Sequence, residues 1–115
     1  LTKGFLFFSG DPVNSLMMYD SINTTASWAS IPGALGYDVI RGNLAAIQES
    51  GGQIALGSVV CIENDSTDTT TAPNHRDAAM PTLGTGFFYL LRVSGGTYGM
   101  GTSGAPRVPT SGDCP

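Results

Sequence analysis

Charged residues are scarce in this sequence. Lys, Arg, Asp and Glu make up 12% of its 115 residues, about half of the ~25% typical of globular proteins. Five Lys and Arg residues stand against nine Asp and Glu, which gives a net charge of −4. So few basic residues cannot build the positive surface with which proteins hold nucleic acid or anionic membranes. We therefore expect neither of them as a partner.

Long apolar runs are also missing. No stretch approaches the roughly 20 apolar residues that cross a bilayer, so no membrane span is predicted. The run Phe5-Leu6-Phe7-Phe8 is also shorter than the roughly 7–15 apolar residues of a signal-peptide core. Because the chain begins at Leu1 rather than Met, we expect that a signal peptide upstream has been removed. The protein is then extracellular or bound to the cell surface.

Motifs that carry catalysis are lacking. The sequence contains no GxSxG, HExxH or CxxC pattern. His75 is the only histidine, and nothing in the sequence supplies it with an activated serine and a buried acid. Residues 99–104 match the letters of GxGxxG, but Pro106 and Pro109 prevent the helix that a dinucleotide site requires. We expect a protein that is not an enzyme and binds no cofactor.

A few polar residues allow weaker interpretations. Glu63, Asp65, Asp68 and Asp77 could gather oxygen ligands for Ca²⁺, but their spacing is not that of an EF-hand. A turn rich in Asp and Asn with solvated carboxylates accounts for them as well, so no metal site is predicted. Two tripeptides, which begin at Asn23 and Asn64, fit the glycosylation sequon, a pattern short enough to arise by chance.

The sequence has two cysteines, Cys61 and Cys114. In a reducing compartment they would be unrelated thiols. In an oxidising one they would form a disulfide that holds the C-terminal tail against the middle of the chain. Closing a loop of that length contributes about 4 kcal/mol in the chain-entropy description. We predict the disulfide; whether it forms within one chain or between two chains is left open by the sequence.

Alternation of side chains predicts several short strands. Thr24, Ala26 and Trp28 share one face of residues 24–28, and after a Pro-Gly break residues 36–41 alternate again. Asn43 is expected to cap a helical turn over residues 44–49, ended by the two glycines that follow. The other predicted strands cover residues 13–18, 53–62, 69–71, 87–93 and 98–108. Polar loops are expected at 63–68 and 73–81.

The pair Trp28 and Tyr37 resembles the B and C strands of a fibronectin type III-like β-sandwich, in which the two rings pack between the sheets. Residues 83–93 resemble the E–F corner and F strand of that family, although the corner position holds Phe87 instead of tyrosine. The resemblance covers about residues 13–110. It implies an all-β, two-sheet sandwich over residues 13–115, with one short helical turn and an extra N-terminal strand within residues 1–12. The expected core is Trp28, Tyr37, Val39, Phe87, Tyr89 and Leu91.

Two segments are apolar on both faces of the predicted strands. They are Phe5, Leu6, Phe7 and Phe8, and the F strand, where Phe88 and Leu90 would point outward. Such strands need cover on both sides. We expect these six residues to form an assembly interface of an extracellular filament or pilus. The partners would be copies of this chain or a helical pilin. The alternatives are that the chain covers them itself, or that the protein is an adhesion or carbohydrate-binding module.

Overall fold

The computed structural model describes residues 5–9, 17–20, 24–82, 84–100 and 104–115, with only the backbone of the first two segments. Residues 13–16 of the predicted first strand, Asn23 and residues 101–103 lie outside this part. The chain is all-β, as predicted, with one 3-10 turn, η1 (Leu44–Ala46). The strands are β1 (Phe5–Ser9), β2 (Met17–Asp20), β3 (Thr24–Ser27), β4 (Tyr37–Asn43), β5 (Gln48–Ser50), β6 (Gln53–Ala55), β7 (Val59–Ser66), β8 (Phe87–Val93) and β9 (Arg107–Val108).

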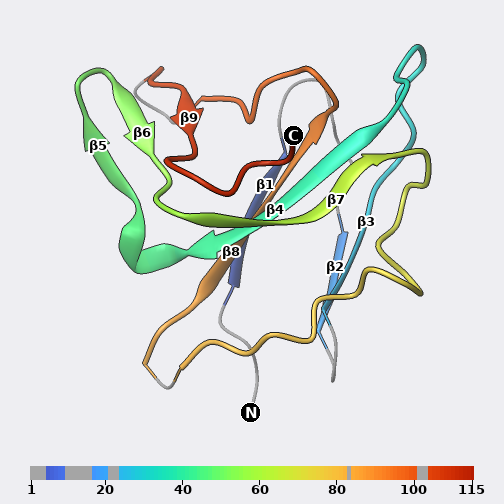
Figure 1. The fold of residues 1–115 in the computed structure, drawn as a ribbon, viewed down its shortest axis with the longest axis horizontal. Coiled ribbons are helices and arrows are strands. Elements are labelled where there is room, and N and C mark those ends of the chain that lie inside the picture. Colours follow the sequence, from blue (N-terminus) through green and yellow to red (C-terminus); the bar gives the residue numbers. More distant parts are fainter. Residues whose placement is uncertain (1–4, 10–16, 21–23, 83, 101–103) are drawn as a thin grey trace.

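A four-stranded sheet in the order β1-β8-β4-β7 forms the centre of this small β-sandwich (Figure 1). β4 runs antiparallel to both β7 and β8, whereas β1 runs parallel to β8. The two-stranded sheet of β2 and β3 lies to one side of this sheet, and the small sheet β5-β6-β9 lies to the other (Figure 1). The central sheet therefore has cover available for both of its faces.

The core consists of two clusters, which take alternate residues of β4 and β8. Val39 and Leu91 pack with Tyr37, Ala26 and Trp28 on the face toward β3. The intervening residues of these two strands, including Ile40, Phe88 and Leu90, lie on the other face. They pack with residues from β6, β7 and the C-terminal region. Gly42 makes room for this second cluster, because a Cβ there would collide with the Phe88 ring. Strand β8 is apolar on both faces because both faces are buried.

Phe88 and Leu90 do not form the outward assembly surface that we expected. Both side chains are completely buried within the chain. The residues that follow β4 fold back over this face: Leu56 and Tyr98 belong to the same buried cluster, and Leu44, Ile47 and Ile54 pack against it. For these two residues the alternative, that the chain covers its own sheet, is correct.

Other differences from the sequence prediction are local. The helical turn stops at Ala46, and residues 48–50 form β5 instead. Gly51 and Gly52, with φ of 62° and 80°, make the tight turn between β5 and β6 rather than ending a helix. The strand expected over residues 53–62 is broken near Gly57, whose φ is 77°, and β7 then continues through the expected turn as far as Ser66.

The remaining strands were predicted with mixed success. β3, β4 and β8 lie where the alternation placed them, and β8 has the predicted bounds. Within residues 69–71 only Thr70 pairs, through one bridge to Ser27. In the described part of residues 98–108, strand pairing is limited to β9 and a bridge between Met100 and Pro106.

Candidate functional site

The two cysteines form a disulfide within the chain. Cys61 lies on β7, and Cys114 lies 53 residues further on, with 5.1 Å between the two Cα atoms. Cys114 is 5% exposed and is part of the core cluster that contains Phe88 and Leu90. The predicted disulfide is confirmed, and it fixes the C-terminal region against the central sheet.

A buried ion pair lies on the same face of the sheet. Asp38 on β4 and Arg92 on β8 are cross-strand neighbours, and Arg92 Nε donates to Asp38 Oδ2 over 2.7 Å. The other carboxylate oxygen of Asp38 accepts hydrogen bonds from Ser94 Oγ at 3.0 Å and from the backbone N–H of Asp65 at 2.8 Å. Both oxygens of this 2% exposed residue are satisfied, so its charge can stay buried.

Arg92 also holds the end of the chain. Its Nη1 donates to Asp113 Oδ2 at 3.3 Å, and its Nη2 donates to the Cys114 carbonyl at 3.5 Å. The guanidinium carbon lies 4.5 Å from the centre of the Tyr98 ring, within range of a cation–π interaction. The Tyr98 hydroxyl in turn donates to Asp113 Oδ1 at 2.6 Å. We call Asp38, Arg92, Tyr98, Asp113 and the disulfide the C-terminal clamp.

The pKa shifts in the clamp follow from these contacts. Burial alone would lower the pKa of Arg92, but its hydrogen bond to Asp38 and the nearby negative charges raise it above its usual value. Burial and the hydrogen bond to Asp113 raise the pKa of Tyr98. Arg92 therefore keeps its charge and Tyr98 keeps its proton, as a fixed structural contact requires.

A second buried carboxylate, Asp77, lies on the opposite face. Its Oδ1 accepts from Arg41 Nη1 at 2.7 Å and its Oδ2 accepts from the Tyr89 hydroxyl at 2.6 Å. Its backbone exchanges two hydrogen bonds with Thr24, of 2.8 and 2.9 Å. Burial would raise the pKa of Asp77, but hydrogen bonds from Tyr89, Arg41 and the Ala79 amide outweigh it and lower the pKa. Asp77 thus attaches the 73–81 loop to β3, β4 and β8.

His75, the single histidine of the sequence, contacts a buried carboxylate. Its Nδ1 lies 2.6 Å from Oε1 of Glu63, whose side chain is 4% exposed. The four acidic residues considered for Ca²⁺ are not brought together, since Glu63 faces His75 and Asp77 faces Arg41. Among the described residues, no group of three or more His, Cys, Asp and Glu side chains could hold a metal ion.

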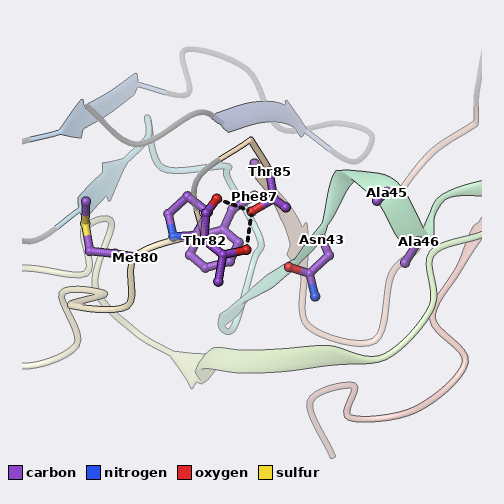
Figure 2. Close-up of a pocket in the computed structure, with 9 residues that line it drawn as sticks. Asn43, Ala45, Ala46, Met80, Thr82, Thr85 and Phe87 are labelled. Atoms are coloured by element: carbon purple, nitrogen blue, oxygen red, sulfur yellow. Dashed lines mark hydrogen bonds between the residues drawn. The ribbon is translucent and has the colours of Figure 1, made fainter. Parts of the chain in front are cut away.

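One pocket opens where the 3-10 turn meets the loop before β8 (Figure 2). Its volume is about 530 Å³. The Thr85 hydroxyl donates to the Thr82 carbonyl at 2.6 Å and lies 3.1 Å from the Thr82 hydroxyl. None of the described residues that line it is ionisable, so it offers no proton donor or acceptor for acid–base chemistry. The lining residues are Asn43, Ala45, Ala46, Met80, Pro81, Thr82, Thr85, Gly86 and Phe87.

The predicted core residues are buried, and the Trp28 and Tyr37 rings pack edge to face with their centroids 5.5 Å apart. All of the residues predicted for the core are at most 8% exposed: Trp28, Tyr37, Val39, Phe87, Tyr89 and Leu91. Sequence reasoning missed the charged residues that hold the segments together. The available signal was the charged residues within largely apolar strands, namely Asp38 and Arg41 in β4 and Arg92 in β8. Their partners lie too far along the chain to be recognised by spacing.

The predicted assembly strand belongs to the chain's own sheet. β1 pairs with β8 in parallel, from Phe5 opposite Phe87 to Ser9 opposite Leu91. For Phe5, Leu6, Phe7 and Phe8 the structure describes the backbone alone. The order of the sheet places β1 at one edge and β7 at the other. Edge strands are where sheets recruit further strands.

The part of the chain that the structure describes includes no helix long and apolar enough to cross a bilayer. Comparisons with family models, with curated proteins and with solved structures give no match to this chain.

Proposed function

We propose that this protein is a non-enzymatic structural subunit of an extracellular assembly, such as a filament or pilus. It would be exported through a signal peptide that is then removed. It would associate with copies of itself or with a helical pilin. The observation that carries the proposal is that the buried carboxylates hold the chain together. Asp38, Asp77 and Glu63 each bind another segment of the same chain.

Such an arrangement supports a structural role. A buried ion pair costs about as much to desolvate as it returns in attraction, so it contributes more to a fixed geometry than to net stability. In this chain the ion pairs join β4, β8, the 73–81 loop and the C-terminal residues. The disulfide adds a covalent connection, which persists in an oxidising compartment. A subunit that must transmit force benefits from the ion pairs and from the disulfide.

The alternative, a carbohydrate-binding or adhesion module, would present aromatic rings on an exposed platform. Trp28 and Tyr98 cannot do so, because they are 6% and 2% exposed. Tyr19 is a further candidate ring, and its side chain lies outside the part that the structure describes. The pocket beside Phe87 has no exposed aromatic wall, since that ring is 8% exposed. The structural role is therefore the better supported of the two.

The direct test is negative-stain electron microscopy, with analytical sedimentation, of the protein isolated from its native source. Regular filaments or a defined complex with another subunit would support the proposal. A monomer at all concentrations that binds an immobilised polysaccharide would replace it with the adhesion alternative. Deleting residues 1–9 is a poor test of assembly, because it also removes β1 from the chain's own sheet.

A further inference from the structure

Residues 104–115 form the last segment of the chain, which we call the C-terminal strap. It lies at the red end of the colour scale in Figure 1 and includes β9. Among its residues only Ala105 and Cys114 are buried, at 7% and 5% exposure. Burial of apolar side chains therefore contributes little to holding the strap in place.

Main-chain hydrogen bonds attach the strap to β6 and to the start of β7. Three amides of that segment donate to strap carbonyls, over 2.7, 2.9 and 2.9 Å: Ile54 to Pro106, Leu56 to Val108 and Val59 to Ser111. In the other direction, the Thr110 amide donates to the Gly57 carbonyl at 2.9 Å. The strap is thus a parallel strand laid along a segment whose Leu56 and Val59 side chains belong to the buried core.

Two side chains fix the far end of the strap. One is Cys114, through its disulfide to Cys61. The other is Asp113, which accepts hydrogen bonds from the Tyr98 hydroxyl at 2.6 Å and from Arg92 at 3.3 Å. The Asp113 side chain is 34% exposed, and ion pairs in contact with water contribute little. Without the disulfide, the strap is a segment of the kind that opens locally while the rest of a protein stays folded.

We propose that the C-terminal strap is a redox-sensitive element, which opens as a unit when the disulfide is reduced while the central sheet stays folded. This inference goes beyond the proposed structural role and does not depend on it. In an oxidising compartment the disulfide persists and the strap is closed. In a reducing compartment the strap opens, and the amides of Ile54, Leu56 and Val59 lose their partners.

The reductant is a dithiol, and the exchange proceeds in two steps. Cys61 is partly buried whereas Cys114 is buried, so the first thiolate of the dithiol attacks the Cys61 sulfur and the Cys114 thiolate leaves. The second thiolate then attacks the mixed disulfide and expels the Cys61 thiolate. Two electrons pass to the protein, the two protons of the dithiol end on the cysteine thiols, and the reductant leaves as a cyclic disulfide.

Amide hydrogen exchange of the whole chain, before and after reduction with dithiothreitol, tests this opening. The first set of amides is that of Ile54, Leu56 and Val59, which donate to the strap. The second set consists of the amides within β4 and β8. We expect the ratio of the two exchange rates, first set over second, to rise about tenfold or more on reduction. A ratio that stays constant, whether both sets accelerate together or neither does, overturns the proposal.

Trypsin cleavage after Arg107 gives a second measurement of the same opening. In the closed strap the Arg107 amide donates to the Gly99 carbonyl at 3.0 Å, and the Val108 carbonyl accepts from the Leu56 amide. Reduction should accelerate this cut about tenfold or more, because proteolysis follows the population of the open form. Cleavage after Arg76, which lies outside the strap, is the internal control. If reduction accelerates both cuts equally, the strap does not open on its own.

A matched pair of variants separates the disulfide from the ionic contact. In the reduced protein, Asp113→Asn should open the strap about threefold further, because it weakens the attachment to Arg92. In the oxidised protein it should leave the strap closed. Asp68→Asn removes an exposed carboxylate outside the strap and should change neither form. If Asp113→Asn opens the oxidised strap as far as reduction does, the disulfide is not what closes it and the redox role is overturned.

Discussion

At the residue scale, the folded structure is sensitive to the loss of any one of a few buried carboxylates. Asp38 accepts hydrogen bonds from Arg92, Ser94 and the Asp65 amide. Removing it leaves Arg92, which is 15% exposed, with a poorly compensated charge. Breaking a buried pair in this way typically costs about 3–5 kcal/mol, far more than the net contribution of the pair.

We therefore expect Asp38→Ala to lower the free energy of unfolding by about 3 kcal/mol or more, measured by urea denaturation. Asp68→Ala removes an exposed carboxylate and should change the free energy by less than about 0.5 kcal/mol. Equal effects of the two substitutions would show that Asp38 does not stabilise the core.

The lowered pKa of Asp77 predicts an acid-sensitive fold. A carboxyl group whose pKa is lower in the folded state than its ordinary 3.8 binds protons more weakly when folded. Its stabilisation is present above pH 4 and is lost as the pH falls through the folded pKa. The free energy of unfolding should thus decline below about pH 4, and Asp77→Asn should make this decline shallower. An unchanged acid slope in the variant would assign acid sensitivity to other groups.

Sequence reasoning at this scale identified the apolar core residues but not the partners of the charged ones. Trp28 and Tyr37 were predicted for the core from the family resemblance, and Leu91 from alternation along its strand, which is a local property. The partners of Arg92 include Asp113, 21 positions away in the chain, and no local pattern connects them. Phe88 and Leu90 were recognised as apolar, but the segments that cover them could not be foreseen from the strand itself.

At the scale of elements, β8 was predicted with its bounds because it is an apolar run interrupted only by Arg92, with glycines on each side. The segment that follows β4 was harder, because three residues of 3-10 helix and a three-residue strand are both too short for a period to be read. Its final arrangement is set by packing on the central sheet, where Leu44 and Ile47 contact the core.

The C-terminal clamp allows a prediction for the C-terminal segment, which includes β9, when its disulfide is removed. Replacing both cysteines, with Cys61→Ser and Cys114→Ser, removes a link across 53 positions. The free energy of unfolding should fall by about 4 kcal/mol on the chain-entropy description. Because Arg92 still binds Asp113, the double variant should fold, with faster amide hydrogen exchange around β9. Exchange that is unchanged there would mean that the ionic contacts alone hold the segment.

At the scale of the whole molecule, cover on both faces of one sheet leaves few places open to a protease. Arg41, Arg92 and Arg107 are partly buried, whereas Arg76 lies exposed in the 73–81 loop. Among the arginines of the described residues, trypsin should therefore cut the native protein first after Arg76. The Asp77 amide at this bond donates to the Thr24 carbonyl at 2.9 Å, so the loop must open locally before trypsin cuts there.

The disulfide determines what this cut yields. Cys61 lies before the cleavage site and Cys114 after it, so residues 1–76 and 77–115 should migrate together on a non-reducing gel. They should separate only after reduction. Separation without reductant, in protein first shown by mass analysis to be fully oxidised, would indicate that the cysteines pair between chains.

The parallel pairing of β1 with β8 constrains the order in which the protein can fold. Phe5 meets Phe87, so about eighty residues must be synthesised before the first strand finds its neighbour in the same chain. Contacts of such sequence separation form slowly, because a long loop must close first. Until then the FLFF segment stays without its own strand partner and can pair with another unfinished chain. The yield of native protein should therefore fall as the concentration of nascent chains rises.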